Sequence, residues 1–378
     1  MPKSGKTPSR KDPVSPDVFF EKELAGESAL TRATAHRLYD LGADFYALRP
    51  WDILADQDLI MLKAPDSGEM CYCSVMGALG RVFSMHAYLG PEGYQLFKRI
   101  AVGQPITAGE FFASLRSVSI EFVASSELTP PDRRLLRAFS HPFKRGVICP
   151  MFRAGRPGYR PWYTTEDEGR LLALCLQSVL VFCDYIESHP AVAYWGKEDT
   201  YPLVSLDTGR SHNRKCSVTL TPAQWSPLNI FGPSDYDKDR VDRILIQGLP
   251  VANILEVDHF YGAATFGGKH ERKACLRVAI AAEARSGFAF PPVLGEPSDT
   301  KGDLLVSVVL GAIESARFLP QEIRVNGADS AMALSSVANA LGISVQVAES
   351  LPALEELKLH MLRMMDDPAT NLNREPGE

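Results

Sequence analysis

The stretch "EIRVNGADSAMALSSVANALGISVQV", residues 322–347, decides the fold of the second half of the chain. Short apolar runs predict strands at 322–325 and 343–347, and the small residues at 330–341 predict a helix that ends at Gly342. A strand, a helix and a strand in close succession form a parallel pair with a right-handed crossover. The sequence therefore predicts that these two strands are parallel neighbours in one sheet.

The elements on either side of this unit complete one domain. The pattern predicts strands at 252–266 and 273–284, a turn at Ser286-Gly287 followed by "FAFPPVL", a helix at 300–317 and a closing helix at 352–365. This order predicts a C-terminal α/β domain with a mixed sheet over residues 240–367.

The first half of the chain carries a different pattern. It predicts helices at 28–48, 91–101 and 109–123, strands at 59–64, 70–76, 82–88, 201–207 and 216–222, and a break at the two prolines of "SELTPPDRR". We therefore expect an α+β domain with an antiparallel meander over residues 18–230, and a boundary in "NIFGPSDYDKDR" (229–240). Disordered tails are expected at 1–17 and 368–378.

Composition limits the function classes. With 378 residues, a formal net charge of −6 and 45% hydrophobic residues, the chain resembles a globular protein and not one that coats nucleic acid. Its seven scattered cysteines predict reduced thiols and a cytoplasmic location. The longest apolar stretch, "LLALCLQSVLVFC" (171–183), is too short to span a bilayer and contains Gln177, so no membrane is expected.

One basic segment, "RAGRPGYRPWY" (153–163), lies just before an acidic helix start at Glu166, Asp167 and Glu168. It permits two interpretations. In the first, the segment binds an anionic ligand, with phosphates on the arginines and bases on the rings; the candidate residues are Arg153, Arg156, Arg160, Tyr159 and Trp162. In the second, the arginines anchor an irregular loop by covering aromatic faces and pairing with the acids at 166–168. The second interpretation is favoured, and it predicts a largely buried Trp162.

The order of elements over the last third of the chain resembles the ribonuclease H-like fold. Active members of that fold hold two divalent ions, Mg²⁺ or Mn²⁺, between acids on the first strand, the first helix, the end of the fourth strand and the last helix. The resemblance implies Asp258, Glu314, Asp329 and either Glu355 or Glu356 at these places. Glu314 departs from the pattern, because it lies near the end of its helix and not near the start. The other acids have ordinary explanations: strand alternation predicts an exposed Asp258, helix capping explains Asp329, and a solvated helix face explains Glu355 and Glu356.

A second resemblance concerns the whole chain. "FRAGRPGYRPWY" and "ISVQVAESLPALEEL" look like an uncharacterised bacterial family with two domains and no assigned activity. No metal site is predicted, because Cys71 and Cys73 lack a partner pair, and His259 and His270 are interpreted as surface histidines.

The leading hypothesis is a non-catalytic cytoplasmic binding or scaffold protein without a cofactor, whose basic segment meets a protein partner or an anionic ligand. Nucleic acid is one such ligand. The alternative is a metal-dependent nuclease centred on Asp258, so whether the protein is an enzyme stays open at this point.

Overall fold

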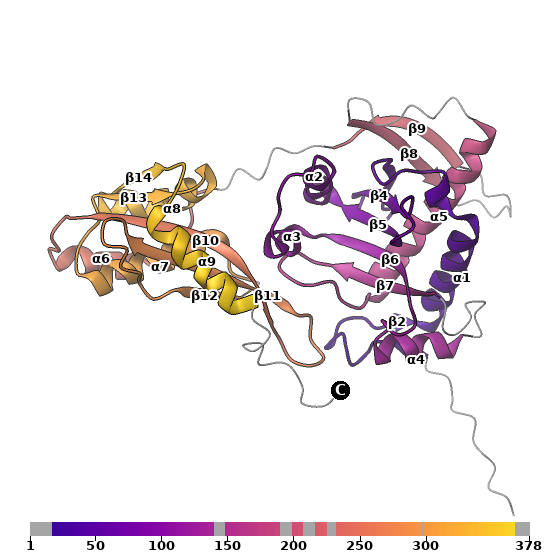
Figure 1. Ribbon diagram of the computed structural model, residues 1–378, viewed down its shortest axis with the longest axis horizontal. Coiled ribbons are helices and arrows are strands. Elements are labelled where there is room, and N and C mark those ends of the chain that lie inside the picture. The colour runs from indigo at the N-terminus through magenta and orange to yellow at the C-terminus, as the bar shows by residue number, and fades with distance from the viewer. Residues whose placement is uncertain are drawn as a thin grey trace, which may run out of the picture.

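The computed structural model shows two α+β domains joined along one chain (Figure 1). It describes residues 17–139, 148–189, 199–206, 216–224, 232–296 and 298–366. The predicted tails lie outside these ranges, apart from Asp17, and so does part of the predicted boundary at 229–240.

The N-terminal domain is built on a seven-stranded sheet with the order β7-β6-β5-β4-β3-β8-β9. Its strands are β3 (Ile60–Lys63), β4 (Met70–Met76), β5 (Phe83–Leu89), β6 (Ser117–Val123), β7 (Cys149–Gly155), β8 (Thr200–Leu206) and β9 (Cys216–Pro222). Neighbours are antiparallel except β3 and β8, which are parallel. A separate two-stranded sheet pairs β1 (Val18–Phe19) with β2 (Leu30–Thr31). The predicted meander is therefore present and continues into β6 and β7.

Helices cover both faces of this sheet. On one face α1 (Arg32–Leu48) and α5 (Glu166–Ser188) enclose the main core, and η1 (Pro50–Asp52) adds Trp51 to it. On the other face α2 (Gly90–Ala101) and α3 (Ala108–Ser114) cover part of the strands, and α4 (Pro130–Ala138) lies at the end of the domain (Figure 1).

One helix in the described ranges, α5, is long and apolar enough to cross a membrane by length and composition. Its 23 residues extend beyond the apolar stretch 171–183 at both ends. The prediction that this segment is too short to span a bilayer therefore does not hold for the whole helix. In this structure 56% of its most apolar window is buried, against α1 and the sheet. Burial of this kind is typical of a central core helix.

The C-terminal domain has a five-stranded mixed sheet with the order β12-β11-β10-β13-β14. The strands are β10 (Ile254–Phe266), β11 (Ala274–Glu283), β12 (Val293–Gly295), β13 (Glu322–Val325) and β14 (Ser344–Val347). The helices α6 (Lys238–Ile246), α7 (Lys301–Ala316) and α8 (Ala328–Leu341) share a core on one face, and α9 (Pro352–Asp366) packs on the other. As predicted, β13 and β14 are parallel neighbours and residues 330–341 are helical.

Two local predictions were wrong. Residues 109–123 form α3 and then strand β6, because the alternating "SVSIEFV" fits a central strand between β5 and β7. The prolines of "SELTPPDRR" begin α4 instead of only interrupting the chain. Proline is tolerated in the first turn of a helix, where its missing N–H has no intrahelical partner.

The two domains meet where the β10–β11 hairpin reaches the N-terminal domain (Figure 1). Helix α3 packs directly on β10 at Tyr261. A Cβ atom on Gly109 would lie 2.5 Å from the Cβ of Tyr261, so only glycine permits this approach of the helix to the strand.

Candidate functional site

The basic segment 153–163 forms part of the junction between the domains. Gly158 has φ +85°, a conformation that favours glycine, and its carbonyl accepts a hydrogen bond of 2.8 Å from the Cys275 N–H. The Arg160 N–H donates to the Lys273 carbonyl at 2.9 Å, and Tyr159 forms a bridge with Ala274. The segment therefore adds a short length of backbone to the start of β11, in the other domain.

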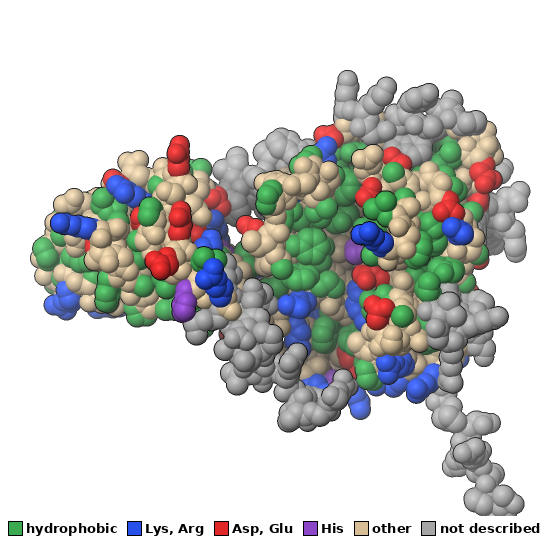
Figure 2. Space-filling view, viewed as in Figure 1, with side chains coloured by type: hydrophobic (Ala, Val, Ile, Leu, Met, Phe, Trp, Pro, Cys, Tyr) green, Lys and Arg blue, Asp and Glu red, His purple; other side chains and the backbone are tan. Residues whose placement is uncertain are grey.

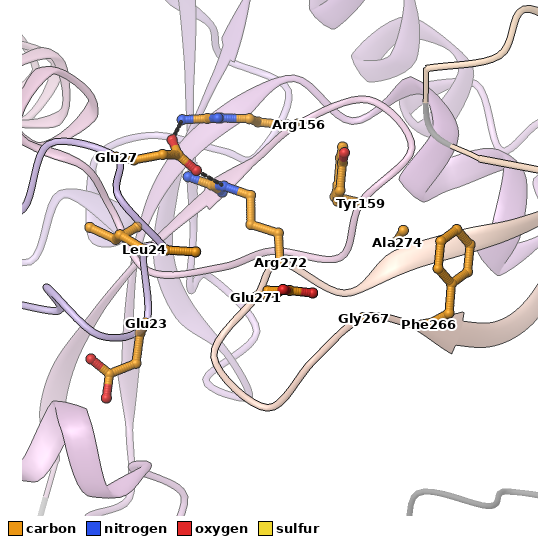
Figure 3. A pocket seen from close by; sticks show the side chains of 11 residues that line it. Glu23, Leu24, Glu27, Arg156, Tyr159, Phe266, Gly267, Glu271, Arg272 and Ala274 are labelled. Atoms are coloured by element: carbon orange, nitrogen blue, oxygen red, sulfur yellow. Dashed lines mark hydrogen bonds and ion pairs between the residues drawn. The ribbon is translucent and has the colours of Figure 1, made fainter.

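Four charged side chains form a network across this junction, which we call the junction network: Glu27, Arg156, Glu168 and Arg272. Arg156 donates to Glu27 at 2.5 Å and to Glu168 at 2.8 Å. Arg272, which comes from the C-terminal domain, donates to Glu27 at 3.2 Å and to Glu168 at 3.1 Å. Figure 3 shows both arginines directed at Glu27. The nearby arginines hold the pKa of Glu168 below its usual value in spite of burial, so each carboxylate is shared between two guanidinium groups.

The remaining basic residues of the segment also contact other side chains of the protein. Arg153 is buried and donates to both oxygens of Asp132, at 2.9 and 2.7 Å, while its guanidinium lies 4.8 Å from the centre of the Tyr163 ring. The guanidinium of Arg160 lies 5.4 Å from the centre of the Phe112 ring. These contacts, with the Arg156–Glu168 pair, are those that the anchoring interpretation predicts.

The prediction of a largely buried Trp162 is confirmed in part, because its side chain is of intermediate exposure. Its ring is partly exposed and packs at the edge of the core, against Tyr163. Its indole N–H donates to the Glu23 carbonyl at 2.6 Å, which ties the segment to the chain before α1. The backbone of Trp162 pairs with Ala154 through two hydrogen bonds, of 2.8 and 2.9 Å.

A pocket of about 350 Å³, which we call the junction pocket, opens beside the junction network, and both domains line it. Its charged and aromatic lining residues are Glu23, Glu27, Arg156, Tyr159, Phe266, Glu271 and Arg272 (Figure 3). Phe266 is 37% exposed, and one Glu271 oxygen accepts from the Gly268 N–H at 2.7 Å. The pocket combines aromatic surface with carboxylates, and its arginines are already paired.

The sequence pointed to Arg156 and Tyr159 but missed Glu27, Glu271 and Arg272. Glu27 lies 129 residues from Arg156 along the chain, and Arg272 lies 245 residues from Glu27. The charged turn "GGKHERK" (267–273) was the available signal, and it was interpreted only as a hairpin.

In the C-terminal domain, Asp258 is buried under α9, so its predicted exposure was wrong. Its carboxylate accepts hydrogen bonds from Lys358 Nζ at 2.9 Å and from Asn326 Nδ2 at 2.9 Å, and one from the His259 N–H at 2.8 Å. Donors therefore surround the carboxylate at the place where the nuclease hypothesis requires metal ions.

The other acids of the nuclease hypothesis are not assembled around Asp258. Glu314 pairs with Arg240 on α6 at 2.7 Å, and Asp329 pairs with Lys301 at the start of α7 at 2.7 Å. Glu355 and Glu356 are exposed on α9, as a solvated helix face predicts. Across the described ranges no three His, Cys, Asp or Glu side chains form a group that could hold a metal ion. These residues do not fit a centre with two metal ions.

His259 lies among cations on β10. Its Nε2 atom is buried without a hydrogen-bond partner, and its ring meets the Tyr261 ring edge-on at 4.9 Å. Burial, with the charges of Lys301, Arg277 and Lys358, lowers the pKa of His259 to about 3. The imidazole therefore stays neutral in the folded protein at pH values where it is protonated in the unfolded chain.

This shift predicts a loss of stability in mild acid. Below the unfolded pKa near 6.5 the unfolded chain takes up a proton that the folded protein does not, so the free energy of unfolding falls as pH falls. At about pH 5 the loss from His259 is about 2 kcal/mol. Urea unfolding of the native protein and of His259→Phe, at about pH 7 and about pH 5, measures it. An equal loss in both proteins would contradict the prediction.

Two matches were found in comparisons with protein families. Residues 36–202 match the model of a domain of unknown function (DUF7309), and residues 245–362 match a second one (DUF6930). A search of curated proteins found no match. The first match covers α1 to the start of β8 with the basic segment, and the second covers the β10–β14 sheet. The chain thus joins two uncharacterised domains, which fits the two-domain family that the sequence resembles, and neither match carries an activity.

Proposed function

We propose that this protein is a non-catalytic binding protein and that the junction pocket is its ligand site. The observation that carries the proposal is the pocket itself, because two domains contribute side chains to it and neither forms it alone. Ligand pockets occur preferentially at interfaces between domains. The partner we infer is a protein segment that presents a cationic side chain, lysine or arginine, to Tyr159, Phe266 and Glu271.

The charges of the pocket support a cationic occupant. Three lining residues are glutamates, Glu23, Glu27 and Glu271, and two are arginines, Arg156 and Arg272. Both arginines bind Glu27, and Arg134 binds Glu23, so Glu271 is the carboxylate that we assign to the cation. A cation over an aromatic face next to a carboxylate gains from both the ring and the charge. An anionic ligand would have to displace Glu27 or Glu168 from the arginines, so the anionic interpretation of the basic segment is the weaker one.

The donors around Asp258 support the non-catalytic part of the proposal. An ammonium group and an amide at hydrogen-bond distance compete with any divalent ion for this carboxylate. The order of the five strands, three antiparallel and then two parallel, supports the resemblance to the ribonuclease H-like fold. We infer a domain of that kind in a bacterial cytoplasmic protein, and the free thiols of the seven cysteines support the location.

Fluorescence anisotropy with two labelled probes tests the proposal. One probe is a short peptide rich in lysine and arginine, and the other is a short single-stranded oligonucleotide. We expect the peptide to bind, and Phe266→Ala and Glu271→Gln each to weaken its binding about tenfold. Glu349→Gln, at an exposed glutamate outside the pocket, is the matched control and should leave binding unchanged.

Two results would contradict this proposal. If the oligonucleotide binds in a salt-dependent manner and Arg156→Glu abolishes its binding, the ligand is anionic. If the variants at Phe266 and Glu271 bind the peptide as well as the native protein does, the pocket is not the binding site.

A further inference from the structure

A polar patch lies on the face of the seven-stranded sheet that α2 and α3 cover only in part. Alternation along β5 places Ser84 and His86 on this face, and alternation along β6 places Ser119 and Glu121 there. Ser84 lies directly across from Glu121, and His86 lies across from Ser119. Figure 2 shows purple and red side chains on this side of the N-terminal domain. The sequence did not reveal the patch, because residues 117–123 were predicted to be helical.

Two features of the patch remain unexplained by folding. The Ser84 hydroxyl is buried and has no hydrogen-bond partner among the residues that the structure describes, although leaving such a group unpaired is unfavourable. His86 Nε2 lies 3.7 Å from Glu121 Oε1, which is too long for a hydrogen bond.

The separation of these two atoms fits a shared ligand. Zinc lies about 2.0–2.2 Å from an imidazole nitrogen or a carboxylate oxygen. Two donor atoms 3.7 Å apart at that distance from one ion subtend an angle of about 120° at it, within the range of zinc coordination. The imidazole side chain is 21% exposed and the carboxylate side chain 31%, so an ion in solution can reach both.

Charges of both signs lie near the patch. Arg153 and Glu127 both act on Glu121, Arg153 the more strongly, and the Arg153 guanidinium donates to both oxygens of Asp132.

We propose that His86 and Glu121 bind a divalent transition-metal ion, with zinc as the reference ion. Water completes the coordination sphere, and the Ser84 hydroxyl, across from Glu121, is placed to hydrogen-bond to it. The site has one nitrogen and one oxygen ligand from the protein, so its affinity is lower than that of a structural zinc site with four protein ligands. It is separate from the junction pocket and does not depend on the proposed function.

Calorimetric titration of the full chain with zinc chloride tests the proposal. We expect one equivalent to bind, and His86→Ala and Glu121→Gln each to weaken binding at least about tenfold. Glu121→Gln keeps the shape of the side chain, so it serves as the test if His86→Ala fails to fold. The cobalt complex should lack thiolate charge-transfer absorption, which distinguishes this site from binding to the cysteines.

The matched control is His36→Ala. His36 and Asp40 form a pair of the same kind on α1, 2.8 Å apart but 63% and 59% exposed. Zinc binding that survives both His86→Ala and Glu121→Gln, or that disappears only in His36→Ala, would overturn the proposal. So would a native protein with no zinc affinity below about 1 mM.

Discussion

Replacement of Arg272 by leucine is expected to separate the two domains. The Arg272 side chain is 7% exposed and binds Glu27 and Glu168 across the junction. Without it, the buried Glu168 and the half-buried Glu27 keep only Arg156, so we expect a loss below the about 3–5 kcal/mol that removal of the sole partner of a buried charge costs. We expect small-angle scattering to show a larger radius of gyration, and urea unfolding to resolve into two transitions. We expect both results because the β10–β11 hairpin loses the side chain that connects it to the N-terminal domain.

Arg170→Leu is the matched control for this experiment. Arg170 binds Glu166 at 2.8 Å, four residues away on α5, but its side chain is 63% exposed. Glu166 is buried, but it keeps hydrogen bonds from the Thr31 N–H and the Thr34 hydroxyl, and Arg170 does not cross the junction. The control should therefore keep the native radius of gyration and a single transition. An unchanged radius of gyration in Arg272→Leu would show that backbone pairing at Tyr159 and Ala274 is sufficient to hold the domains.

Arg153→Leu is expected to destabilise the N-terminal domain by about 3–5 kcal/mol, without separating the domains. The two hydrogen bonds from Arg153 to Asp132 connect β7 to the first turn of α4, and both side chains are buried. Without the guanidinium, the Asp132 carboxylate keeps only its capping bonds to Thr129. Urea unfolding measures the loss in the free energy of unfolding, and small-angle scattering should show the radius of gyration of the native protein.

The double variant Arg153→Leu with Asp132→Leu sharpens this prediction. Removal of both charges leaves no buried charge unpaired, although the capping bonds between Thr129 and Asp132 are lost, so part of the lost stability should return. Arg49→Leu removes a pair with Asp52 of similar length whose side chains are 61% and 53% exposed, and it should cost less than about 1 kcal/mol. A loss in the double variant equal to or larger than that in Arg153→Leu would contradict the explanation.

The elements with a strong local pattern could be predicted from the sequence. Strand β4 has the predicted bounds, and the parallel pair β13–β14 follows from its flanking helix and Gly342. Such patterns are local, because the hydrophobic period and the residue that ends a helix lie within one segment. Residues 117–123 were predicted incorrectly. They are a short run of alternating residues next to a helical pattern, and their strand conformation depends on pairing with the neighbouring strands β5 and β7.

The candidate site was predicted only in part. The sequence by itself determined that residues 153–163 concentrate arginine and aromatic side chains before an acidic helix start, and that an α+β domain precedes a domain with a mixed sheet. Only the tertiary structure decided that Arg156 shares its carboxylates with Arg272, that Lys358 lies on Asp258, and that His86 lies beside Glu121. The physical reason is that charge pairing depends on distances of about 3–4 Å between side chains distant in sequence. Sheet register and domain docking, which no local pattern records, set those distances.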